Sequence, residues 1–244
     1  MTLLTDLVTA LASGEHRVVD LTQPLSERTP VLQLPEPFAN TPGLTRTEIS
    51  RYDDRGPAWA WDTLQIGEHV GTHFDAPIHW ITGRDGEDVA SVSPARLVGP
   101  AVVIDRSAEA AEDPDYLLTV DDLPQPLPEN GWVLLRTGWD ARASDQADFL
   151  NGGRTPGPDV ECARALAESS IAGFGVETVG TDAGMAHSFD PPFPVHNFLL
   201  GAGKYGITQL ANLAELPPTG AVIVVAPLKL VDGTGSPSRI YALV

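Results

Sequence analysis

Three histidines and an aspartate lie within the fourteen residues GEHVGTHFDAPIHW, residues 67–80, although the whole chain has 6 histidines. No regular element brings His69, His73 and Asp75 together. In a strand, His69 and His73 would stand about 13 Å apart at roughly 3.3 Å per residue, and in a helix Asp75 would point away from His73. A strand that ends near His69 and turns at Gly71 would gather them, because glycine adopts backbone angles closed to other residues.

Two imidazoles and one carboxylate form a facial ligand set that leaves positions open for water and substrate, and this set suits Zn, Mn or Fe(II). A divalent ion bound there lowers the pKa of its water and polarises a carbonyl oxygen, which is the chemistry of hydrolysis. His69, His73 and Asp75 are therefore the predicted metal ligands. His79 is the predicted general acid or base, and a role in orienting a ligand is the alternative.

Three tryptophans flank this cluster: Trp59, Trp61 and Trp80. Core packing is the common fate of tryptophan. The alternative, which we favour for Trp61 and Trp80, is an apolar wall for a planar or cyclic substrate. The stretch DGTGSPSR, residues 232–239, lacks the ending of a phosphate loop and predicts a tight turn before the final strand.

The composition narrows the class of protein. The chain has 15 basic and 33 acidic residues, and its net charge of -18 repels phosphate backbones and anionic membrane surfaces. Cys162 is the only cysteine, which excludes an intrachain disulfide and fits a reducing compartment. Apolar residues in the segment 3–11 have helical spacing, which predicts an amphipathic helix, and no stretch approaches the roughly eighteen apolar residues of a membrane span. We expect a soluble, cytoplasmic protein that binds a small molecule and neither nucleic acid nor membrane.

The elements that must position the cluster are mostly strands. Runs rich in Val, Ile and Leu predict buried strands, several of them covered on both faces. These runs are residues 17–22, 60–70, 100–106, 131–139, 171–179, 221–231 and 239–244. Helical signals beyond the N-terminal segment lie at residues 119–123, 157–169 and 194–203. The mixture predicts an α/β or α+β fold, and no Pro- or Gly-rich loop is long enough to divide residues 1–244 into two domains.

The cluster also resembles a known family. The pattern H-x-G-T-H-x-D-x-P-x-H is matched at its seven fixed positions, His69, Gly71, Thr72, His73, Asp75, Pro77 and His79. By this pattern the chain resembles the cyclase family of metal-dependent hydrolases, which includes bacterial kynurenine formamidase (arylformamidase) and isatin hydrolase. The segments VVDLTQPLSERTPV, VLLRTGW, PVHNFLL and APLKLVDGTGSPSR also resemble the family, so the resemblance extends over most of the chain.

The resemblance implies a single α/β domain with a mixed sheet, of the swivelling β/β/α type, over residues 1–244. It implies hydrolysis of an amide, lactam or ester carbonyl by a metal-activated water. It also implies a homodimer or larger homo-oligomer in which a neighbour contributes pocket residues. Asp182, in the family-like segment VGTDAG, is either a residue that shapes the site or a turn-forming aspartate.

Two further positions bear on the number of metal ions. His196 stands where kynurenine formamidases carry another metal-ligand histidine, and twelve residues later those enzymes place a glutamate that bridges two metals. Here that position is Thr208, followed by Gln209, and neither offsets the repulsion between two dications. The resemblance to isatin hydrolase, with one manganese and a neutral glutamine-type ligand, implies one divalent ion, Mn or Zn, with Gln209 as a ligand. His196 then serves the substrate or a proton relay.

The expected function is therefore a mononuclear metal-dependent hydrolase that resembles isatin hydrolase. Two alternatives stay open: a binuclear zinc kynurenine formamidase, and a non-catalytic metal- or ligand-binding protein with the same fold. An open ligand set argues against the second, because structural metal sites are usually closed by four protein ligands. We expect substrate choice to depend on loops such as residues 24–60.

Overall fold

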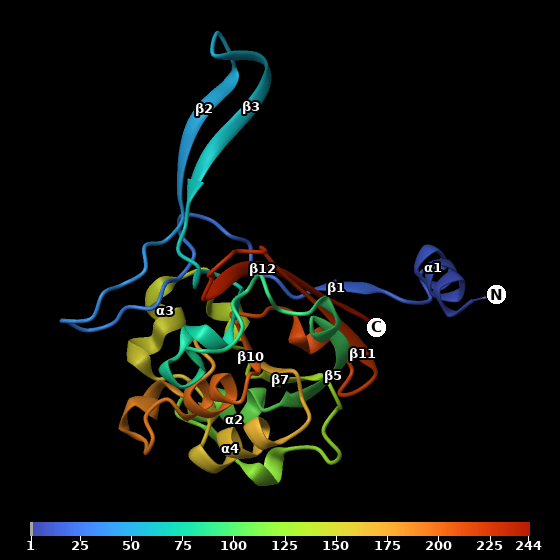
Figure 1. Cartoon of the computed structure of the whole chain (residues 1–244), viewed down its shortest axis with the longest axis vertical. Coiled ribbons are helices and arrows are strands. Elements are labelled where there is room, and N and C mark those ends of the chain that lie inside the picture. Colours follow the sequence, from blue (N-terminus) through green and yellow to red (C-terminus); the bar gives the residue numbers. More distant parts are fainter. Residues whose placement is uncertain (1) are drawn as a thin grey trace.

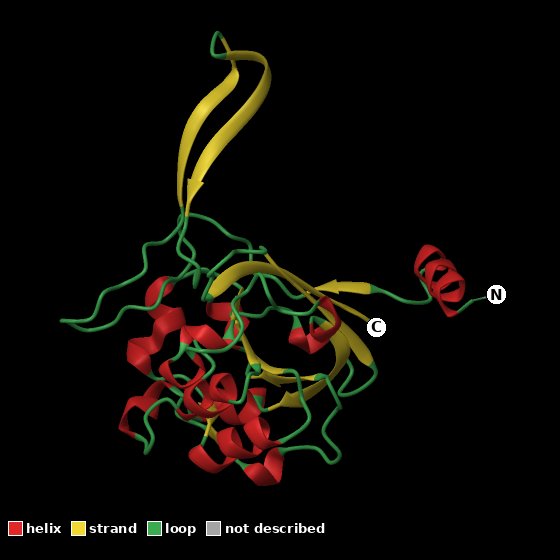
Figure 2. Cartoon of the chain, in the orientation of Figure 1, coloured by secondary structure: helices red, strands yellow, loops and turns green. Residues whose placement is uncertain are grey.

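The computed structural model describes residues 2–244. At its centre is an eight-stranded sheet with the strand order β1-β12-β11-β5-β7-β9-β10-β4. Because β4 pairs with both β10 and β12, the sheet closes on itself, and Figure 2 shows the strands curving around the core. The strands are β1 (Val18–Asp20), β4 (His73–Asp75), β5 (Val98–Asp105), β7 (Trp132–Arg136), β9 (Gly173–Val176), β10 (Tyr205–Thr208), β11 (Ala221–Pro227) and β12 (Gly235–Leu243).

The sheet is mixed, as predicted. β5, β7, β9 and β10 run parallel to one another, whereas β4, β11 and β12 pair antiparallel with their neighbours. The short strand β4 completes the ring, because His73 lies opposite Thr208 of β10 on one side and Pro237 of β12 on the other. The histidine-rich segment is therefore held between two strands that come from the last forty residues of the chain.

Strand β7 shows why the central strands are apolar on both faces. Trp132 and Leu134 belong to the core cluster inside the ring, to which the other strands except β9 also contribute. Val133 and Leu135 point outward and pack with Leu166 of helix α4 (Val160–Glu168). Full burial of one such side chain stabilises the fold by roughly 1.5–3 kcal/mol. Figure 1 shows α4 gathered with α2 (Ser107–Glu112) and α3 (Gln146–Leu150) on one side of the sheet.

Two pieces of the chain project from this body (Figure 1). One is an antiparallel hairpin of β2 (Thr45–Asp53) and β3 (Gly56–Gln65), which we call the arm. The other is helix α1 (Leu3–Ser13), which Thr2 caps and in which Ala10 is the only buried residue. Large apolar side chains on these two pieces are exposed: Leu3, Leu4 and Val8 on α1, and Ile49, Tyr52, Trp59, Trp61 and Leu64 on the arm.

The structure confirms the predicted mixed-sheet α/β class, the N-terminal helix and a strand in each of the apolar runs. The segment 157–169 contains α4, whereas the segments 119–123 and 194–203 form shorter turns, a 3-10 turn at Val120–Asp122 and a π-helical turn at His196–Leu200. A two-stranded sheet of β6 (Leu117–Leu118) and β8 (Gly157–Pro158) lies outside the main one. Among residues 2–244, none of the helices has the length and apolar character needed to cross a bilayer.

Candidate functional site

The histidine-rich segment bends where its spacing requires. β3 ends at Gln65, β4 begins at His73, and between them Gly71 has a φ of +65°. This left-handed conformation is costly for residues with a side chain, and a Cβ at this position would also approach Leu25 Cδ1 to 2.9 Å. The predicted turn at Gly71 is confirmed. It brings the rings of His69 and His73 to a centroid distance of 5.2 Å.

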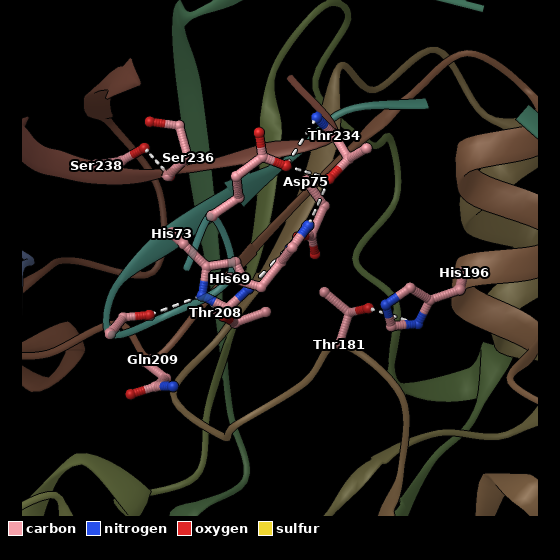
Figure 3. Close-up of polar contacts among 12 residues, drawn as sticks. His69, His73, Asp75, Thr181, His196, Thr208, Gln209, Thr234, Ser236 and Ser238 are labelled. Atoms are coloured by element: carbon pink, nitrogen blue, oxygen red, sulfur yellow. Dashed lines mark hydrogen bonds and ion pairs between the residues drawn. The ribbon is translucent and has the colours of Figure 1, made fainter. Parts of the chain in front are cut away.

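Asp75 lies at the centre of the cluster (Figure 3). Its Oδ1 atom is 2.8 Å from His69 Nδ1 and 3.4 Å from His73 Nε2. The ring of His79 stacks on that of His69 at a centroid distance of 3.9 Å. Ligand atoms of His69, Asp75 and His79 all lie within 4.8 Å of one another. His73 is outside this closest group but within reach of the same carboxylate oxygen.

Asp75 and His79 differ in charge, because the cluster stabilises a charged carboxylate at Asp75 and a neutral imidazole at His79. Burial alone would raise the pKa of Asp75, but the charges of His73 and His69 and their hydrogen bonds hold it well below its usual range. Burial lowers the pKa of His79 to about 3, and the neighbouring histidines add to this effect while Asp75 opposes it. At neutral pH His79 is therefore an uncharged imidazole that can accept a proton.

The partners of His69 indicate that a cation belongs beside Asp75. The hydroxyl of Thr234 donates to Glu68, so this hydroxyl accepts at 2.9 Å from His69 Nε2. His69 Nδ1 can donate to Asp75 Oδ1 only when the ring is protonated; with a single hydrogen on Nε2, two acceptors face each other at 2.8 Å, and a cation would separate them. Donors that are each 2.0–2.2 Å from one ion stand about 3 Å apart, so the donor set fits a divalent ion. Gly235 allows this arrangement, because a Cβ there would lie 2.4 Å from His69 Cε1.

Gln209 carries an acceptor without a partner. Its side chain is 1% exposed, and its Oε1 atom makes no hydrogen bond to any residue of the described chain, 2–244. Its backbone is fixed, since Gln209 N donates to the Thr178 carbonyl at 2.9 Å and the Thr72 hydroxyl donates to the Gln209 carbonyl at 2.6 Å. It also has a φ of +54°, a strained conformation for a residue of this size. A buried acceptor left unpaired costs about 1–3 kcal/mol, and a cation would relieve that cost.

Thr208, just before Gln209, contacts His73. Its Oγ1 atom lies 3.0 Å from Nδ1 and 3.2 Å from Nε2 of His73, and the side chain is buried. The backbone carbonyl of Gly71 lies 2.7 Å from His73 Nδ1. The position at which the family resemblance implied a bridging glutamate for a binuclear site therefore holds an uncharged hydroxyl, which contacts His73.

His196 lies across the site from Asp75 and pairs with Asp182. Its Nδ1 atom forms a short hydrogen bond with Asp182 Oδ2. Figure 3 shows a longer contact of 3.4 Å between the same atom and Thr181 Oγ1. Burial opposes protonation of His196, but the hydrogen bond and charge of Asp182 outweigh it and raise its pKa above the usual value. Its ring is 5.6 Å from that of His79 and 4.8 Å from that of Trp80.

The structure gathers most of the predicted site residues and leaves one apart. Trp61 lies on the arm, where its side chain is 56% exposed and packs edge-on with Trp59 at 6.3 Å. Trp80 is at the site, and Phe193 contacts it at 5.7 Å with a left-handed φ of 53°. The residues brought together are His69, His73, Asp75, His79, Trp80 and His196. Gln209 directly follows Thr208, which lies opposite His73, and its amide nitrogen contacts the Pro30 carbonyl at 3.5 Å.

Sequence reasoning missed several contacts of these residues. Only the first residues of the predicted turn 232–239 form a turn, because β12 already begins at Gly235, and Thr234 in this turn also contacts His69. Phe193 was not singled out at all. Neither residue has a local signal, because Thr234 is 165 positions from His69 and Phe193 is apolar within a Pro-rich loop.

Two imidazoles and a buried carboxylate beside a neutral histidine, on a closed mixed sheet, define the class of metal-assisted hydrolases. The chain belongs to the cyclase family, since residues 19–183 match the family described as "Putative cyclase". It is 48% identical to isatin hydrolase from Roseibium aggregatum, over 99% of this chain and 97% of that protein. The kynurenine formamidase of Salinibacter ruber is 29% identical over 72% of this chain and 76% of that enzyme.

A solved structure agrees with this assignment. The crystal structure of an isatin hydrolase bound to the product analogue thioisatinate matches this fold with a TM-score of 0.97 and 45% identity. The match covers 100% of this chain and 99% of that chain. The protein is therefore a hydrolase of the cyclase family.

Proposed function

We propose that this hydrolase opens the lactam ring of isatin or a closely related cyclic amide, using one divalent ion held by His69, His73, Asp75 and Gln209. One observation carries the proposal: ligand atoms of His69 and Asp75 converge within 4.8 Å beside His79, in a chain that aligns end to end with isatin hydrolases. Residues 1–244 act as one domain in this proposal. A lactone or other ester would use the same groups.

The proposed ion is Mn or Zn, with Mn favoured by oxygen ligands from Asp75, Gln209 and water. When bound, such an ion supplies a Lewis acid that lowers the pKa of water and polarises a carbonyl. The facing acceptors of His69 and Asp75 and the unpaired Oε1 of Gln209 support this ligand set. Thr208 supports a single ion, since its hydroxyl contacts His73 and brings no charge to balance a second dication.

The protein's own groups handle the proton and the orientation of the substrate. His79 accepts the proton of the attacking water as a neutral imidazole and returns it to the leaving nitrogen. Hydroxyl is thereby added to the carbonyl carbon and hydrogen to the nitrogen, so the C–N bond breaks and a carboxylic acid and an amine form. Trp80 and Phe193 provide an apolar wall for the planar ring, and His196 contacts the substrate or relays a proton.

We also propose that the chain works as a homo-oligomer, a dimer in the simplest case. The arm exposes five large apolar side chains, and an isolated two-stranded hairpin is marginally stable in water. A second copy that covers the arm and the open face of α1 would bury these groups. Trp61 would then serve as a pocket residue of the neighbouring site, and would not serve its own. The single buried thiol, Cys162, fits a reducing cytoplasmic compartment.

The proposed activity is tested by offering the purified protein isatin and, separately, N-formylkynurenine. We expect a product of isatin that is heavier by one water, formed with excess Mn or Zn and abolished by a chelator. Failure to open isatin, or clear preference for N-formylkynurenine, would overturn the proposal.

A further inference from the structure

We propose that Asp182 is a positioning residue, which holds His196 in the tautomer whose Nε2 atom is bare and directed to the reacting groups. The proposal rests on the proposed function, because it assigns a role within the same site. Asp182 could instead serve only to form a turn, and the two roles differ in whether Asp182 acts through His196.

The carboxylate of Asp182 is buried and uses both oxygens. Oδ1 accepts from Val195 N at 2.7 Å, and Oδ2 accepts from His196 N at 3.2 Å and from His196 Nδ1. A carboxylate has no proton to donate, so the hydrogen must reside on Nδ1. In a neutral imidazole the other nitrogen is then an acceptor.

A turn-forming role explains only part of these contacts. The bonds to the two backbone N–H groups would suffice to fix the turn that begins at His196, as Asp159 does at α4 by accepting from Cys162 N at 2.7 Å. The bond to His196 Nδ1 adds nothing to that turn, but it fixes the ring. Asp182 therefore differs from Asp159 in one respect: it also accepts a hydrogen bond from an imidazole ring.

The ring that Asp182 fixes lies at the site. Its centroid is 5.6 Å from that of His79 and 4.8 Å from that of Trp80, and its side chain is 15% exposed. Among residues 2–244, the hydrogen bonds of the ring involve only Nδ1. Nε2 is thus the atom that remains to accept a hydrogen bond from the substrate or to take a proton from it.

The substitution Asp182→Asn keeps the shape of the side chain but replaces an acceptor by an amide that can donate to Nδ1. The hydrogen on His196 would then move to Nε2. We expect kcat for isatin to fall about 10²-fold while KM changes less than about threefold, because the altered atom acts in the reaction and the pocket walls are kept. Asp159→Asn, a matched change at the N-cap of α4, should leave both constants within about twofold, since the side chain of Asp159 accepts its hydrogen bond from Cys162 N within α4.

The tautomer can be read directly by ¹⁵N NMR of histidine side chains in the Zn-loaded enzyme, with the His196 signals assigned from a His196→Gln variant. At a pH high enough to leave the ring of His196 neutral despite its raised pKa, the wild type should carry the single ring hydrogen on Nδ1, and Asp182→Asn should shift it to Nε2. Hydrogen on Nε2 in the wild type would overturn the proposal, even if Asp182→Asn failed to fold. Unchanged kcat in a folded Asp182→Asn enzyme would overturn it as well.

These outcomes are distinct from failure of the proposed function. If the wild type does not open isatin, the activity assignment fails, and the NMR result still decides whether Asp182 sets the tautomer of His196. If isatin is opened and the wild-type hydrogen is on Nε2, the role of Asp182 alone fails.

Discussion

At the scale of single residues, three site histidines share one arrangement. In each, one ring nitrogen contacts an oxygen outside the reacting centre, and the other nitrogen is left for the site. Such contacts select a tautomer and stop the ring from rotating, which prepares the nitrogen for a metal ion or a substrate. The pairs are His69 with Thr234, His73 with Gly71, and His196 with Asp182.

Within residues 2–244, the ring of His79 has no hydrogen bond of this kind, which suits a group that must gain and lose a proton. We predict that His79→Ala lowers kcat/KM for isatin by at least about 10²-fold, the contribution typical of a general acid or base. Metal content, measured by elemental analysis, should stay that of the wild type. The exposed His187 offers a control, and His187→Ala should leave both quantities unchanged. Because His79 lies within 4.8 Å of His69 and Asp75, a loss of metal would instead identify it as a ligand.

Glu177 is a buried carboxyl whose protonation depends on folding. Burial, with a smaller effect of Asp140, raises the pKa of Glu177 to about 7, although hydrogen bonds from Thr137 and Trp139 oppose the shift. A raised pKa in the folded state gives stability that is complete below the ordinary carboxyl pKa and is lost as pH rises through about 7.

Glu177→Gln should remove this dependence, because the amide oxygen can still accept the hydrogen bonds. We predict that the variant gains roughly 2–3 kcal/mol relative to wild type between pH 5 and pH 8, as measured by urea unfolding at each pH. Glu161→Gln, on the exposed surface of α4, should show no such change. If the free energy of unfolding of Glu177→Gln differed from that of wild type by the same amount at pH 5 and pH 8, Glu177 would already be charged at pH 5.

At the scale of elements, the turn at Gly71 determines whether the ligands meet. Gly71→Ala would place a side chain at φ +65°, at a cost of roughly 1–2 kcal/mol, and press it against Leu25. We predict a loss of stability of this size together with loss of metal binding. Gly152 also has φ +65° but has open space around it, so Gly152→Ala should lose similar stability and keep its metal. Retained metal and activity in Gly71→Ala would show that the turn is not required.

The arm carries Trp61, which we propose enters the site of a second copy of the chain. If it brings Trp61 into a neighbouring site, Trp61→Ala and His79→Ala should each be poorly active alone. A mixed dimer would hold one site with both native residues, so mixing equal amounts and allowing exchange should restore about one quarter of wild-type activity. Velocity sedimentation should show dimers of each variant. No recovery in dimers that do exchange would place Trp61 outside the neighbouring pocket.

The elements also show what sequence could and could not predict. The run VLLR in β7 is apolar at every buried position because both faces are covered, so it was predictable. β4 was not predictable as a strand, since three residues show no periodicity and it forms only by pairing with β10 and β12. β2 was not predicted either, although it is long enough to show a pattern. Nearly all of its side chains are exposed, so it has no apolar face to reveal.

At the scale of the whole molecule, closure of the sheet assembles the site. Segments 69–80, 181–196, 208–209 and 234–235 meet because β4 lies between β10 and β12. The motif predicted the ligands and the turn because they are local. The motif could not predict the hydrogen bonds of Asp182 with His196 or of Thr234 with His69, because these contacts depend on the path of the chain between the partners.

The central claim is that one metal ion in this site opens a lactam. The most direct measurement is a titration of metal-free protein with Mn while the rate of isatin opening is recorded, with the bound metal counted by elemental analysis. We predict no activity without metal and a rate that rises to a plateau at one ion per chain, with neither binding nor activity in His73→Ala. A plateau at two ions per chain would contradict the mononuclear site and favour the binuclear alternative. No opening of isatin at any ratio would contradict the claim itself.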